Sequence, residues 1–118
     1  MRKLNTSDIF NFCRLVKATD AREQLRSIVT AVAKKKDGGE PVDVTQVGVD
    51  GVLAVIEAAV EPKAEALVYK FLAGPLECTA EDVAAMELDA LLHALKEIAE
   101  ANNLTTFFGS VSGILGKD

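Results

Sequence analysis

The sequence predicts an all-α protein, a compact bundle of five or six short helices joined by short loops. Hydrophobic residues make up 49% of the 118 residues, but only 5% are aromatic and none is tryptophan. Small apolar residues suit close helix packing better than a sheet built on aromatic cross-strand pairs. Several stretches also place apolar residues three and four positions apart, the spacing of one helix face. The length predicts a single domain, residues 1–118.

Two helices are expected in the first third of the chain. Thr6 or Ser7 can cap the first, with Asp8 in its first turn, where the helix dipole favours a negative charge. Asp20 can cap the second, and Glu23 would complete its capping box. Their apolar stripes are Ile9, Phe12, Cys13 and Val16, followed by Leu25, Ile28, Val29 and Val32.

The middle of the chain opens with a cluster of glycine and proline that predicts a flexible loop over residues 37–42. Alternating valines after it make a short strand conceivable, but the wider apolar spacing favours a helix from Thr45. Pro62 fits the first position of the next helix. Gly74 and Pro75 are expected to end that helix.

The longest helical pattern runs from Thr79 to Phe108. Thr79 can cap it and form a capping box with Asp82. Asn102 or Asn103 is expected to end the helix in the left-handed conformation. The core face of this helix is predicted to carry Leu88, Leu91, Leu92, Leu95, Ile98 and Ala99.

A second apolar stripe occupies residues 104–118, which predict an amphipathic C-terminal segment interrupted by glycines. Its phenylalanines can close the core of the bundle. Alternatively, the glycine-softened segment can dock on another protein as a helix in a groove. On this second hypothesis its removal abolishes partner capture and leaves the bundle folded. The predicted partner-binding residues are Leu104, Phe107, Phe108, Val111, Ile114 and Leu115, with Arg14 and Lys17 adding charge.

Charge is distributed unevenly along the chain. Residues 1–36 hold nine Lys or Arg against three Asp or Glu, and residues 37–118 hold four against fifteen. The local net charges of +6 and −11 sum to the net charge of −5. This asymmetry can steer a partner or draw the two parts of the chain together. An acidic chain without a recognition-helix signature is not expected to bind nucleic acid. The alternative function is a small nucleic-acid-associated regulator that uses the basic N-terminal helices.

No residue pattern indicates enzymatic chemistry, so we predict no catalytic residues, no cofactor and no metal. His93 is the only histidine, and Cys13 and Cys78 are the only cysteines. A catalytic imidazole needs a partner within hydrogen-bond reach, and zinc needs closely spaced ligands. We interpret these three residues as boundary and packing residues.

The expected location is intracellular. No apolar run approaches the roughly 18 residues of a membrane span. Two cysteines are too few for a disulfide framework, which favours a reducing compartment. A soluble protein with no membrane partner is therefore expected.

Two stretches resemble a known family. The run Met1 to Phe10, continued by Phe12-Cys13-Arg14-Leu15-Val16-Lys17, resembles the start of tail assembly chaperones from siphophages and prophages of Gram-positive bacteria. The second half of those proteins resembles Glu81-Asp82-Val83 through Met86-Glu87-Leu88, Leu91-Leu92, Leu95-Lys96-Glu97-Ile98, and Asn102 to Phe108.

The resemblance implies a small, largely helical, non-enzymatic protein that is needed while a phage tail is built. Its implied partners are the tape measure protein, which it would bind and keep soluble, and the tail tube protein, whose subunits it would help to recruit. The implied location is the host bacterial cytoplasm. An exposed C-terminal stripe would also favour a homo-oligomer.

Overall fold

The computed structural model describes residues 2–115. This part of the chain contains seven α-helices and no strand. The prediction of an all-α fold is confirmed, whereas the expected five or six helices are too few. In chain order the helices are α1 (Thr6–Thr19), α2 (Arg22–Asp37), α3 (Val44–Ala58), α4 (Pro62–Leu76), α5 (Ala80–Ala84), α6 (Leu88–Ala101) and α7 (Leu104–Leu115).

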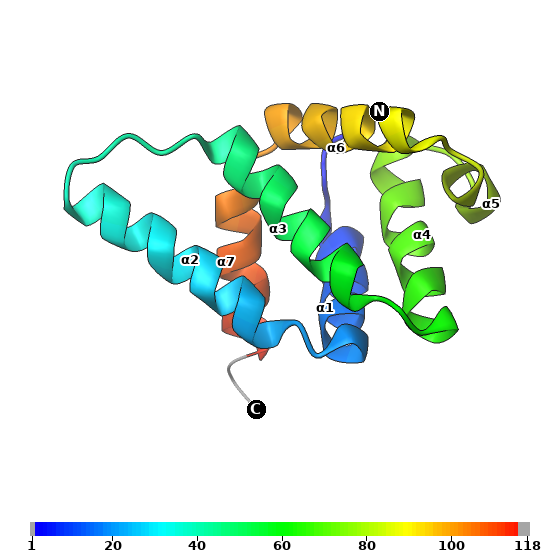
Figure 1. The fold of residues 1–118 in the computed structure, drawn as a ribbon, viewed down its shortest axis with the longest axis horizontal. Helices are drawn as coiled ribbons and strands as arrows, with labels where there is room; N and C mark the ends of the chain where they lie inside the picture. The colour runs from blue at the N-terminus through cyan, green and yellow to red at the C-terminus, as the bar shows by residue number, and fades with distance from the viewer. Residues whose placement is uncertain (1, 116–118) are drawn as a thin grey trace.

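The apolar face of α7 packs against three other helices of the bundle. In Figure 1, α7 passes behind α2 and beside α3, and α6 lies across one side of the bundle. The α7 helix contacts α1, α2 and α3, while α1 packs on α4 and α3 packs on α6. One cluster of buried apolar side chains draws members from all seven helices.

Four phenylalanines form the centre of this core. The ring of Phe12 lies 4.9 Å from Phe71, 5.5 Å from Phe107 and 5.7 Å from Phe108, measured between ring centroids. Such separations are those of favourable offset and edge-to-face aromatic pairs. The cluster therefore joins α1, α4 and α7 at one point.

Two glycines allow α3 to approach α7 closely. A Cβ built on Gly51 would lie 2.6 Å from Cζ of Phe108, and one on Gly48 would lie 2.8 Å from Cδ1 of Leu104. Neither separation leaves room for a methyl group. Glycine is unfavourable in a helix interior, but here its missing side chain makes space for the two α7 side chains.

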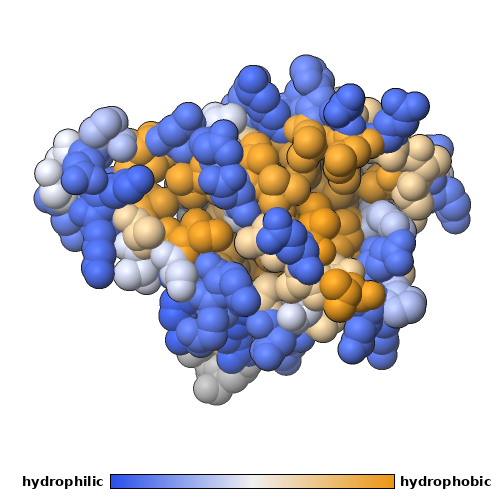
Figure 2. All heavy atoms as spheres, in the orientation of Figure 1, coloured by the Kyte–Doolittle hydropathy of each residue, from blue (hydrophilic) through white to orange (hydrophobic). Residues whose placement is uncertain are grey.

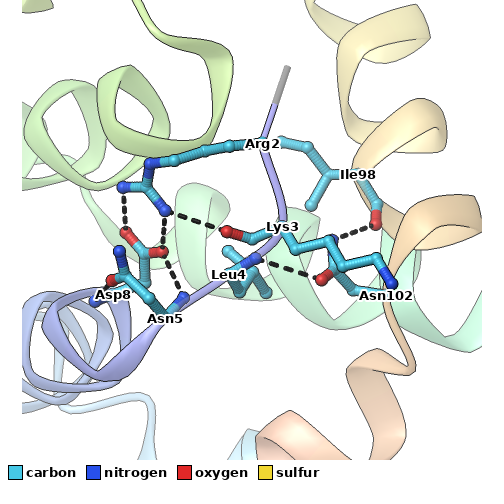
Figure 3. Close-up of polar contacts among 7 residues, drawn as sticks. All are labelled: Arg2, Lys3, Leu4, Asn5, Asp8, Ile98 and Asn102. Atoms are coloured by element: carbon cyan, nitrogen blue, oxygen red, sulfur yellow. Dashed lines mark hydrogen bonds and ion pairs between the residues drawn. The ribbon is translucent and has the colours of Figure 1, made fainter.

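The N-terminal segment, residues 2–5, ties the ends of α4 and α6 together (Figure 3). The backbone N–H of Arg2 donates to the carbonyl oxygen of Pro75 at 2.9 Å. The backbone N–H of Leu4 donates to Oδ1 of Asn102 at 3.1 Å. Leu4 and Asn102 are 98 positions apart in the chain, so this hydrogen bond joins the N-terminal segment to the end of α6.

A charged pair holds this segment to α1. The guanidinium of Arg2 donates to both carboxylate oxygens of Asp8, at 2.7 and 3.1 Å. Asp8 is the buried charged residue among the described ones, and its carboxylate also accepts the backbone N–H of Asn5. A buried carboxylate satisfied by three donors holds its charge without an unpaired polar atom.

The first two helix caps differ from those expected. Asn5, rather than Thr6 or Ser7, caps α1 and forms a capping box with Asp8. Asp20 does not cap α2; it ends α1 in the left-handed conformation, at φ 56°. The backbone N–H groups of Asp20 and Ala21 donate to the carbonyls of Lys17 and Val16, a common helix ending, and Ala21 occupies the N-cap position of α2.

The ends of α4 and α6 also depart from expectation. The α4 helix continues through Gly74 and Pro75 to Leu76, since a proline in the last turn removes only one helix hydrogen bond. Asn102 ends α6 with extended backbone angles rather than left-handed ones. Its side chain is held instead between α6 and the N-terminal segment, donating to the carbonyl of Ile98.

The long helical pattern from Thr79 to Phe108 divides into α5, α6 and α7. Thr79 and Asp82 form the predicted capping box. The chain then turns after Ala84, and Glu87 adopts an extended conformation before α6 begins. No glycine or proline marks this break, so packing rather than local propensity sets it.

The remaining middle elements largely follow the prediction. Pro62 occupies the start of α4 as expected. Asp43 caps α3, which begins at Val44, and the conceivable strand does not form. The predicted loop begins one residue late, because Asp37 still belongs to α2.

Adding a methyl group at Gly51 (Gly51→Ala) should destabilise the protein by about 1–3 kcal/mol, the usual cost of overpacking a core. The matched control is Gly109→Ala in α7, where nothing lies within 4 Å of an added Cβ. That change should stabilise the helix by up to about 1 kcal/mol. Urea unfolding of both variants measures the difference; equal stability of the two would contradict the close α3–α7 packing.

Candidate functional site

The predicted partner-binding stripe lies mostly inside the core. Five of its six apolar residues are buried, and Phe108 is fully so. Ile114 is the exception, with 42% of its surface exposed. Partner binding through the whole stripe would therefore require α7 to leave the core. The end of the predicted segment, residues 116–118, lies outside the described residues.

The burial of α7 also changes the effect that we expect from truncation. A chain without residues 104–118 would lose Phe107 and Phe108, which contact Phe12 at the centre of the core. We therefore expect such a chain to lose its fold, because losing one buried phenylalanine alone costs about 3–5 kcal/mol. The two predicted basic residues, Arg14 and Lys17, are exposed on α1.

An apolar groove lies on another face, between α3, α4, α5 and α6. We call it the α3–α4–α6 groove; its volume is about 230 Å³. In Figure 2 apolar atoms extend from α6 at the upper edge down between α3 and α4. The groove is lined by Ile56, Ala59, Glu65, Val68, Tyr69, Leu72, Val83 and Leu91.

A stripe of leucines on α6 continues this apolar surface out of the core. Leu95 is buried, Leu91 is half-buried, and Leu92 and Leu88 are 38% and 68% exposed. Their spacing places all four on one side of the helix. The C-terminal half of α6 thus packs in the core while its N-terminal half presents leucines to solvent.

The prediction for the core face of α6 is therefore only partly right. Leu95, Ile98 and Ala99 are buried as expected, but Leu88 and Leu92 are not. Val60, in the linker between α3 and α4, adds another exposed apolar side chain, at 84%. The sequence did not predict a site at the groove residues of α3 and α4, because their helical spacing by itself indicates residues that face the core.

A polar pair lies at the edge of the groove. The hydroxyl of Tyr69 donates a hydrogen bond to the carboxylate of Glu65, four residues earlier on α4. This bond, with smaller contributions from desolvation and from the charge of Glu65, raises the pKa of Tyr69 above its ordinary value. The hydroxyl therefore stays protonated to a higher pH.

The residues considered for enzymatic chemistry are not assembled into a site. His93 and Cys78 line a second groove. Within residues 2–115 no hydrogen bond joins their side chains, and the imidazole of His93 instead lies 3.6 Å from the carboxylate of Glu97. Cys13 is buried, and burial raises the pKa of its thiol, which disfavours the reactive thiolate. Across the described part of the chain, no group of His, Cys, Asp and Glu could hold a metal ion.

Comparisons with known proteins add no relative. No helix in the described residues is long and apolar enough to cross a membrane. No family model, curated protein or solved structure matches the chain. The chemistry of the α3–α4–α6 groove and its leucines is therefore the basis for assigning a function.

Removing the Glu65 carboxylate (Glu65→Ala) should lower the pKa of Tyr69 toward 10.0, because the hydrogen bond to Glu65 is the main cause that raises it. Tyr69 is the only tyrosine and the chain has no tryptophan, so near-ultraviolet absorbance follows this phenol alone. Glu61→Ala, at a neighbouring exposed carboxylate, should leave the midpoint unchanged. An unchanged midpoint in Glu65→Ala would rule out the pair.

Proposed function

We propose that this chain is a non-enzymatic tail assembly chaperone, acting in the host bacterial cytoplasm, whose α3–α4–α6 groove holds a helix of the tape measure protein. The observation that carries the proposal is the exposed leucine stripe of α6, with Leu88 and Leu92 beside an apolar groove. The resemblance to tail assembly chaperones includes these residues, since its second stretch contains α5 and the N-terminal half of α6.

A partner helix suits this surface for geometric reasons. The leucines at positions 88, 91, 92 and 95 have the spacing that one helix presents to another. A helix lying beside them would extend the buried seam between α3 and α6 over the exposed half of α6. Full burial of an exposed leucine is worth about 1.5–3 kcal/mol, so two such residues can anchor a complex.

The proposed role follows from what the tape measure protein needs. A long helical protein must have its apolar seams covered until assembly, or the seams associate with one another. Covering one seam in the groove would keep the tape measure protein soluble. Arg14 and Lys17 lie on α1, outside the groove lining, which leaves basic side chains for contact with tail tube subunits.

Replacing one leucine of the stripe (Leu92→Ser) should reduce capture of the co-expressed tape measure protein about tenfold, because a partly exposed leucine would no longer be buried on binding. The matched control is Ile114→Ser, whose side chain is similarly exposed, at 42% against 38%. The amount of tape measure protein that co-purifies measures capture. Circular dichroism checks that both variants keep their helices.

Two results would contradict the assignment. Capture that survives Leu92→Ser but is lost in Ile114→Ser would place the binding surface on α7. A tape measure protein that stays insoluble beside the well-folded wild-type chain would remove the chaperone role itself.

A further inference from the structure

The half of the molecule that carries the groove is strongly acidic. Residues 51–101 contain ten Asp or Glu and three Lys, a local net charge of −7. These residues form the end of α3 and all of α4, α5 and α6. A partner that reaches the groove must therefore enter a negative field.

Three acidic residues belong to the groove lining or lie within two positions of a lining residue in the chain. Glu65 lines the groove, and Glu57 and Glu61 flank Ala59 and Val60 in the chain; all three carboxylates are exposed. Glu57 lies in the last turn of α3, a turn without a basic residue. A helix C-terminus favours cations, so this carboxylate is electrostatically unfavourable until a positive group approaches.

Two of the three lysines of this region lie away from the groove. On α4 the groove side carries Glu65, Val68, Tyr69 and Leu72, and helical spacing places Lys63 and Lys70 away from that side. The third, Lys96, follows Leu92 by one turn on the same side of α6, a single basic group against the carboxylates of Glu57, Glu61 and Glu65. The groove therefore combines an apolar lining with nearby carboxylates whose negative charge the lysines of this region offset only in part.

We infer that the α3–α4–α6 groove takes a basic amphipathic helix, whose apolar stripe packs on Leu88, Leu91 and Leu92 and whose lysine or arginine side chains meet Glu57, Glu61 and Glu65. The inference rests on the proposed function and names the chemistry of the bound segment. Opposite charges around an apolar contact accelerate encounter and reject partners of the wrong charge.

A second copy of this chain is a poorer fit for the groove. The most basic helix that it could offer is α2, which ends in Lys34, Lys35 and Lys36. The apolar residues Leu25 and Val32 of α2 are already buried in its own bundle. Offering them to a neighbour would require α2 to leave that bundle, so a separate partner is the occupant that costs less.

Synthetic peptides test the inference on the full chain. The probe is a helix-forming peptide of leucine and lysine, with leucines at helical spacing and without tyrosine or tryptophan. Its twin carries glutamate in place of lysine. Tyr69 lines the groove and is the only tyrosine or tryptophan, so its fluorescence reports binding there directly.

The basic peptide should change Tyr69 fluorescence and bind at least about tenfold more tightly than the acidic twin, and added salt should weaken it. The double variant Glu57→Gln, Glu61→Gln should weaken binding about tenfold, whereas Glu40→Gln, in the loop after α2, should not. Binding that is equal for both peptides, unaffected by the double variant, or silent at Tyr69 would overturn the inference. So would a wild-type chain that self-associates and loses this association in the double variant.

Failure of the two proposals can be told apart. If the basic peptide does not bind but capture of the tape measure protein still depends on Leu92, the charge inference fails and the proposed function stands. If the peptide binds as expected but the tape measure protein is not captured, the groove chemistry stands and the partner is a different basic helical protein.

Discussion

The structure depends on the burial of α7, and above all on the contact of Phe108 with the backbone of α3 at Gly51. Because the glycine has no side chain, the phenylalanine ring can lie against the helix itself. From that position it reaches Phe12 of α1, whose ring also contacts α4 through Phe71. The last helix therefore completes a core that begins with the first.

This burial decides which apolar surface remains for a partner. With most of the apolar face of α7 buried, the large exposed leucines of the described residues are Leu88 and Leu92 of α6, next in the stripe to Leu91, which lines a groove that α3 and α4 help to form. The N-terminal segment anchors the other end of α6 through the hydrogen bond from Leu4 to Asn102. One half of α6 is thus fixed in the core while the other half presents its leucines, a form suited to holding another helix.

Some local features of the fold could be read from the sequence, although the caps of α1 and α2 and the end of α4 could not. The sequence also could not show which apolar face is buried. The capping box of Thr79 and Asp82 and the start of α4 at Pro62 depend on neighbouring residues, so they were predicted correctly. Spacing also identified the stripes of α6 and α7. Spacing could not show which stripe is buried. Leu92 and Phe108 both lie on the apolar stripe of their helix, and only tertiary packing buries one and leaves the other partly exposed. For the same reason the break before α6 carries no local signal.

Photo-crosslinking tests the central claim, that the groove beside the α6 leucines rather than the C-terminal helix meets the partner. A photo-reactive amino acid is placed at position 88 in one variant and at position 114 in another, and each is co-expressed with the tape measure protein. Both native side chains are exposed, so neither change disturbs the core. The account predicts a crosslink from position 88 and little from position 114. The reverse pattern would contradict it and would mean that α7 is the docking element.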